Sequence, residues 1–111
     1  MNKLHKFKKL TVWQRSIQFV SLIYKITSGF PKEEKYGLVD QIRRAAVSIC
    51  LNIAEGSGAG SDPEFIRFLR MAQRSAYEVI AALEIAINLN MTELTGLIKS
   101  LKARPLDEAS L

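Results

Sequence analysis

Two groups of basic residues in this chain have the type and spacing that bind phosphate groups. The first is a basic N-terminal arm, residues 1–9, whose charged side chains are Lys3, Lys6, Lys8 and Lys9. Residues 1–30 contain five lysines, one arginine and no acidic residue, whereas the rest of the chain is close to neutral. A basic arm on a nearly neutral body is the electrostatic pattern expected for a polyanion partner, usually nucleic acid. The alternative is a solvated tail that only adds solubility.

The second group lies on a predicted helix and consists of Arg67, Arg70 and Arg74. Spacings of three and four residues bring such side chains to within about 60° of one another around a helix. Three arginines on one face could bind phosphates, and Tyr77 at the same edge could stack on a base. The alternative is an exposed face without a ligand, or ion pairs between subunits that use Glu64 or Glu78.

A polar stripe follows the helix before it, again at spacings of three and four residues. Its members are Gln41, Arg44, Ser48, Asn52 and Glu55. One interpretation is a ligand or RNA contact. The other is a polar seam that sets the register between helices or subunits, as buried polar residues can do. The seam is the favoured interpretation, because these five side chains can satisfy one another's hydrogen bonds.

Catalytic and metal-binding groups are scarce. The single histidine, His5, lies in the basic arm with no acid or nucleophile near it in sequence, and the single cysteine, Cys50, lies in a largely apolar helix. One His and one Cys make neither a metal-ligand cluster nor a catalytic triad. The glycine-rich segment 56–60 lacks the Lys and Ser/Thr of a phosphate-binding loop. We therefore expect a non-enzymatic protein without a metal, cofactor or small-molecule substrate.

The chain that positions the basic residues and the polar stripe is predicted to have an all-α fold. Helices are expected at 11–28, from between residues 32 and 38 to Gly56, from the N-cap Ser61 to about residue 88 or 90, and at 92–102. The second would have an irregular first turn at Tyr36-Gly37. The predicted fold is an antiparallel up-down four-helix bundle with a shortened fourth helix. It occupies residues 10–104 and is followed by a frayed C-terminal tail, residues 105–111.

Hydrophobic patterning adds two expectations. No apolar run reaches the roughly 20 residues that a membrane span needs, and no secretory signal is apparent. With its single cysteine, the chain is expected to be cytoplasmic and not to contact a membrane. The core face of the second helix is formed by Leu38, Ile42, Ala45, Ala46, Ile49 and Ile53. Because Val47, Leu51 and Ala54 lie on another side of that helix, neighbouring subunits are expected to cover it.

Three segments of the sequence are distinctive: Glu34-Lys35-Tyr36-Gly37-Leu38, Gln41-Ile42-Arg43-Arg44-Ala45-Ala46, and Asn52-Ile53-Ala54-Glu55-Gly56. With further agreement over about residues 7–90, they resemble the 23S rRNA intervening-sequence protein family, also called the four helix bundle protein family. The resemblance implies a four-helix bundle assembled as a homopentameric ring, encoded in many bacteria by sequences inserted in large-subunit rRNA genes. The chain is also similar to the accessory variability protein of diversity-generating retroelements, a basic pentamer that binds nucleic acid and a reverse transcriptase.

Two functions from different classes follow from these features. The leading hypothesis is a ring-forming accessory protein of an rRNA intervening sequence or a retroelement that binds nucleic acid, with RNA favoured by the family's rRNA-gene context. The competing hypothesis is an oligomeric scaffold whose partner is another protein, such as a reverse transcriptase. In that case the arginines would form interface ion pairs.

Overall fold

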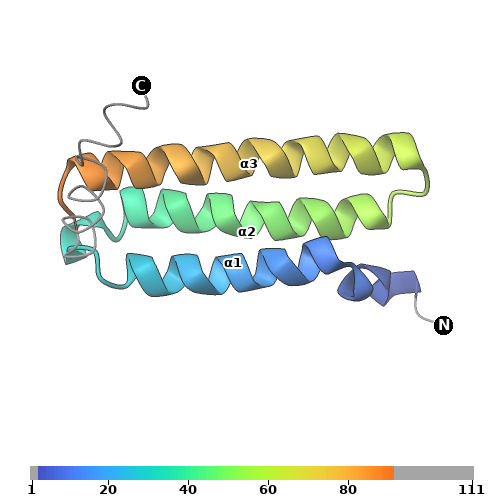
Figure 1. Cartoon of the computed structure of the whole chain (residues 1–111), viewed down its shortest axis with the longest axis horizontal. Coiled ribbons are helices and arrows are strands. Elements are labelled where there is room, and N and C mark those ends of the chain that lie inside the picture. Colours follow the sequence, from blue (N-terminus) through green and yellow to red (C-terminus); the bar gives the residue numbers. More distant parts are fainter. Residues whose placement is uncertain (1–2, 92–111) are drawn as a thin grey trace, which may run out of the picture.

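The computed structural model describes residues 3–91, with side chains from Lys6 onward. Three long α-helices lie side by side and each is antiparallel to its neighbour in sequence (Figure 1). They are α1 (Thr11–Thr27), α2 (Leu38–Ser57) and α3 (Asp62–Asn88), and two short 3-10 helices, η1 (Lys3–Lys9) and η2 (Lys32–Glu34), precede α1 and α2. Residues 3–91 contain no β-strand, so the all-α prediction is confirmed for this part of the chain.

The helix boundaries follow local signals. Ser61 caps α3 as predicted, because its Oγ accepts a hydrogen bond from the backbone N–H of Glu64 at 3.3 Å, and Pro63 lies in the first turn. α1 ends at Thr27, one residue before its predicted end. α2 starts only at Leu38, because residues 32–34 form η2 and the turn at Tyr36-Gly37 separates the two helices.

The core is centred on α2, which lies between α1 and α3 and contacts both (Figure 1). Three side chains, one from each helix, are almost completely excluded from solvent: Ile23, Ile42 and Val79. The predicted core face of α2 is confirmed, since Ile42, Ala45, Ala46 and Ile53 are buried and Leu38 and Ile49 are half-buried. On α3, Ala72 and Val79 are buried.

Small residues bring α2 and α3 close together. Buried alanines line both helices, and Gly56 in the last turn of α2 packs directly on two aromatic side chains of α3. A Cβ built at Gly56 would lie 2.6 Å from Cβ of Phe68 and 2.9 Å from Cδ1 of Phe65. The absence of a side chain at this position is therefore required for the observed approach of the two helices.

Within one chain, α1 and α3 already cover much of the apolar circumference of α2. Val47 and Ala54 are half-buried, and among the large apolar side chains of α2 only Leu51 is exposed. Exposed apolar side chains also lie on the outer helices: Val12, Ile17, Leu22 and Tyr24 on α1, and Ile66, Met71, Tyr77, Ile80 and Ile85 on α3. Cover of α2 by neighbouring subunits therefore stays a prediction, and most of the apolar surface available to a neighbour is on α1 and α3.

Two further predictions concern the ends of the chain. The shortened fourth helix at 92–102 and the tail at 105–111 lie outside the described residues, so a three-helix arrangement is what the structure establishes. None of the described helices has both the length and the apolar composition needed to cross a bilayer.

Candidate nucleic-acid interface

The basic N-terminal arm is an ordered element and not an extended tail. Residues 3–9 form η1, which contacts both α1 and α2. The ring of Phe7 packs edge-on against Trp13 with centroids 5.0 Å apart, and Nε2 of Gln14 donates a hydrogen bond to the carbonyl oxygen of Lys8 at 3.0 Å. These contacts hold the charged segment against the start of α1.

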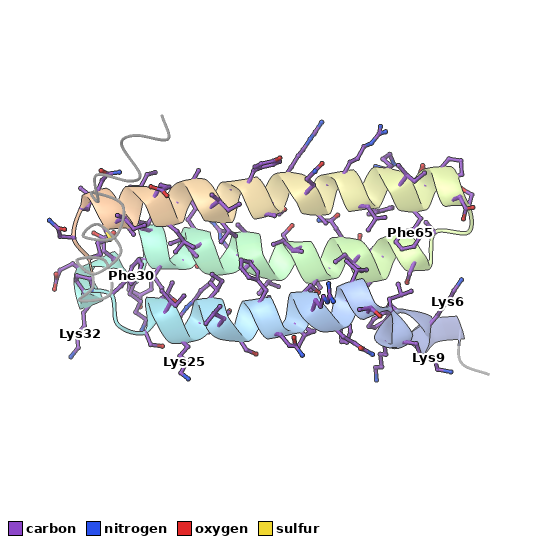
Figure 2. All side chains as sticks on the ribbon, viewed as in Figure 1. Lys6, Lys9, Lys25, Phe30, Lys32 and Phe65 are labelled. Carbon is purple, nitrogen blue, oxygen red and sulfur yellow. The ribbon has the colours of Figure 1, made fainter. Side chains whose placement is uncertain are left out.

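The lysines of η1 are directed away from the helices. Lys6, Lys8 and Lys9 are exposed, and Figure 2 shows Lys6 and Lys9 extending from η1 at the end of the molecule opposite Lys32. The side chain of Lys3 lies outside the described part. Within the described residues, no ion pair engages the three exposed lysines. These three side chains, here called the arm lysines, are available to an anionic partner.

The three arginines of α3 are not equivalent. The guanidinium of Arg67 donates to Glu64, with Nε 3.2 Å from both carboxylate oxygens and Nη2 3.0 Å from Oε1. It also lies 4.7 Å from the ring centroid of Phe68. Hydrogen bonding and charge from Arg67 hold the pKa of the exposed Glu64 carboxyl below its ordinary value. Arg67 is therefore already neutralised by a carboxylate of its own helix.

Arg70 and Arg74 remain available. Both are exposed, and neither has an ion pair or side-chain hydrogen bond with any other residue in the range 6–91. Tyr77, the predicted stacking residue, is also exposed on α3. The predicted arginine face thus presents two free cations where the sequence pattern suggested three.

The middle of the polar stripe on α2 is directed at α3. Nδ2 of Asn52 donates to both the carbonyl oxygen and Oγ of Ser48, at 2.9 and 3.1 Å. Oγ of Ser75 on α3 donates to Oγ of Ser48 at 3.0 Å. These contacts support the seam interpretation for Ser48 and Asn52, with the seam running between two helices of the same chain.

The ends of the stripe lie elsewhere. Arg44 pairs with Asp40, one turn earlier on α2, at 3.3 Å and does not reach Glu55. Gln41 and Glu55 are exposed. A shallow groove of about 490 Å³ runs between α2 and α3 beside the seam, and Gln41, Arg44 and Glu78 line it. The five residues therefore divide into a central hydrogen-bonded pair and three solvent-facing side chains.

A second groove, of about 590 Å³, lies between α1 and α2 and was missed by the sequence analysis. Arg43 anchors it, because its Nε donates to Oγ1 of Thr27 at 2.8 Å and its Nη2 to the carbonyl oxygen of Tyr24 at 3.3 Å. The same guanidinium lies 4.4 Å from the ring centroid of Tyr24. Only the pairing of α1 with α2 brings these groups together, and the adjacent arginines at 43 and 44 were the one signal for it.

The described residues carry cationic surfaces and no group of metal-ligating side chains. No cluster of three His, Cys, Asp or Glu residues suitable for a metal occurs among them, and the thiol of Cys50 is buried and free.

Fold and surface together define a small antiparallel helical protein with exposed basic groups at one end and along its outer helix. The sequence pattern of the 23S rRNA-intervening sequence protein family matches residues 8–103, and the chain belongs to this family. No curated protein matches it.

The family match extends beyond the segments that carry the resemblance in the sequence, past residue 90 and through the whole segment 92–102 in which a fourth helix is predicted. The segment 92–103 is therefore part of the family's sequence pattern. The family match does not test the similarity to the accessory protein of diversity-generating retroelements.

Proposed function

We propose that this family member binds nucleic acid, with RNA as its ligand, through exposed basic side chains, and that it acts by binding without catalysing a reaction. The observation that carries the proposal is the ordered helix η1, which presents Lys6, Lys8 and Lys9 in a 30-residue segment without a single acidic residue. Arg70 and Arg74 supply further cations on α3. The family's name, which refers to 23S rRNA, favours RNA over DNA.

Contacts of this kind recognise the phosphate backbone and do not read sequence. Lysine ammonium groups and single guanidinium groups bind phosphate oxygens regardless of the bases attached. Affinity should then depend steeply on salt, because each neutralised phosphate releases condensed counterions.

The direct test is a titration of the whole protein with fluorescently labelled RNAs of unrelated sequence at several salt concentrations. We expect similar affinities for all sequences and a linear fall of log K with log salt, with a slope of roughly −0.7 per phosphate contact for single strands. If the protein shows no salt-sensitive RNA binding at about 0.15 M salt, the proposal of nucleic-acid binding is wrong. The charge of η1 would then serve only solubility.

We further propose that the chain assembles into an oligomer, a pentamer in the form that the family resemblance suggests, with the segment 92–102 as a shortened fourth helix. The support is the apolar surface of the outer helices, on which Ile66, Tyr77 and Ile80 share one side of α3. An oligomer would also multiply each weak phosphate contact by the number of subunits.

Light scattering after size-exclusion chromatography checks the assembly. The expected mass is a multiple of the 12.5 kDa chain, five-fold for a pentameric ring. As a matched pair, Ile80→Glu should reduce the mass by disrupting the apolar side of α3. Ala81→Glu, which adds the same charge at the next exposed position, about 100° away around α3, should leave the mass unchanged. A monomer at micromolar concentration would exclude the ring.

The same apolar side of α3 favours one alternative, a scaffold that binds another protein such as a reverse transcriptase. A pull-down from lysate with and without nuclease separates the two functions. Partners that persist after nuclease treatment would favour the scaffold, whereas their loss would favour nucleic-acid binding.

A further inference from the structure

The groove between α1 and α2 combines aromatic rings and cations in a way that the arm lysines do not. Its lining includes Tyr24 from α1, Lys35 and Tyr36 from the connection before α2, and Arg43, Arg44 and Leu51 from α2. Its volume of about 590 Å³ lies within the range of sites that hold a small ligand or a nucleotide-sized group. It lies toward the end of the bundle where α1 connects to α2, away from η1 (Figure 1).

Tyr36 is the most exposed of the large hydrophobic side chains in the described part of the chain, at 87% of its full accessible area. It lies in the turn that precedes α2, and Nζ of Lys35 is 5.3 Å from its ring centroid. An aromatic ring with that much free surface, next to an ammonium group, is a platform on which a nucleobase can stack while its phosphate meets the cation.

The opposite side of the groove is rigid. Arg43 is held by two hydrogen bonds to α1 and rests over the ring of Tyr24, which is itself 41% exposed. This guanidinium has lost conformational freedom before any ligand arrives, so a contact with it costs less entropy than a contact with a free side chain. The aromatic and cationic groups of the groove are thus partly preorganised.

Charge complementarity favours an anionic ligand. Three cations line the groove, Lys35, Arg43 and Arg44, against the single carboxylate of Asp40. Asp40 pairs with Arg44 at 3.3 Å and neutralises it, so Lys35 and Arg43 are the two cations of the groove left for a phosphate. Aromatic rings beside an excess of positive charge match a nucleotide better than an acidic peptide, which offers no planar base to stack.

We propose that this groove binds unpaired nucleotides of a single-stranded RNA, with a base stacked on Tyr36 and the adjoining phosphate on Lys35 and Arg43. The inference rests on the proposed function and adds to it a binding mode: the arm lysines hold any polyanion, and the groove selects unstacked strands. Bases within a duplex are paired and stacked, so they cannot reach an aromatic platform.

The experiment measures binding of the full chain to a labelled mixed-sequence single-stranded RNA and to a duplex of the same length at fixed salt. Tyr36→Ala should weaken single-strand binding by about 5- to 100-fold, the loss typical of one base-stacking contact, and leave duplex binding unchanged. Tyr36→Phe keeps the ring and should bind like the wild type. Because Tyr36 is exposed, none of these variants should alter helicity, which circular dichroism checks.

Leu89→Ala is the matched control, since Leu89 is also an exposed large apolar side chain, at 60%, but lies at the C-terminal end of α3 outside the groove. It should retain single-strand affinity. If the wild type binds RNA and Tyr36→Ala binds it equally well, or if Leu89→Ala weakens binding as much as Tyr36→Ala does, the groove is not the stacking site, although the proposed function stands. If the wild type binds neither RNA, both proposals fail.

Discussion

Replacement of Gly56 by alanine is expected to lower the free energy of unfolding by about 1–3 kcal/mol, the usual cost of overpacking a well-filled core. The added methyl group would lie 2.6 Å from Cβ of Phe68 and 2.9 Å from Cδ1 of Phe65. Phe65 could turn its ring away, but Cβ of Phe68 is fixed to the α3 backbone, so the two helices would have to separate locally. Urea denaturation followed by circular dichroism measures the loss.

The matched control is Gly58→Ala, two residues further on. Gly58 has a φ of −96°, which any residue adopts, and a Cβ there would meet only the carbonyl oxygen of Glu55 at 3.7 Å, an ordinary contact. This variant should be neutral or slightly stabilised, because alanine restricts the unfolded chain more than glycine does. Equal stability of the two variants would show that the close approach of α2 and α3 at Gly56 does not matter for folding.

The helices themselves were predictable because their signals are local. The cap of α3 depends on Ser61 and Glu64, which are three residues apart. The core face of α2 follows from apolar residues that recur every three or four positions, a spacing that depends only on the geometry of one helix. Gly56 illustrates where this reasoning stops. As a glycine it indicates the end of a helix, and the end of α2 is indeed one residue away, but its burial against two phenylalanines of α3 depends on how two helices meet.

The candidate site was predictable only in part, because only some of its signals are local in sequence. The positions of Lys6 and Lys9 on the surface follow from their charge, but their order follows from the packing of Phe7 on Trp13, which no charge pattern encodes. Arg43 and Arg44 are adjacent in sequence and about 100° apart around α2. One of them therefore meets α1 and the other Asp40, and only the placement of α1 reveals which.

The apolar circumference of α2 is an observation that two different causes can explain. An all-round apolar helix must be covered on several sides, and the sequence offers no means to decide whether the cover comes from the same chain or from another copy. Here α1 and α3 provide most of it. The case for an oligomer therefore depends on the outer helices, whose exposed isoleucines have no such cover.

Charge reversal at the arm lysines, Lys6→Glu with Lys9→Glu, is expected to weaken RNA binding by roughly 10- to 100-fold at 0.15 M salt and to flatten the salt dependence. Each substitution removes a phosphate contact and adds a repulsive charge at the same place. Because both side chains are exposed on η1, the helical content should stay unchanged. Anisotropy titrations over a range of salt concentrations, repeated with RNAs of unrelated sequence, measure both quantities.

The arginines of α3 supply a control in which each substitution removes the same charge but the expected effect per substitution differs. Arg70→Gln with Arg74→Gln removes two unpaired cations and should lower the salt slope by about two contacts, whereas Arg67→Gln removes a cation that Glu64 already neutralises. If phosphates bind at free cations, Arg67→Gln should cost much less per charge than the other two. Equal losses per charge would instead mean that only the net charge of the protein matters, so that no defined surface on η1 or α3 holds the RNA.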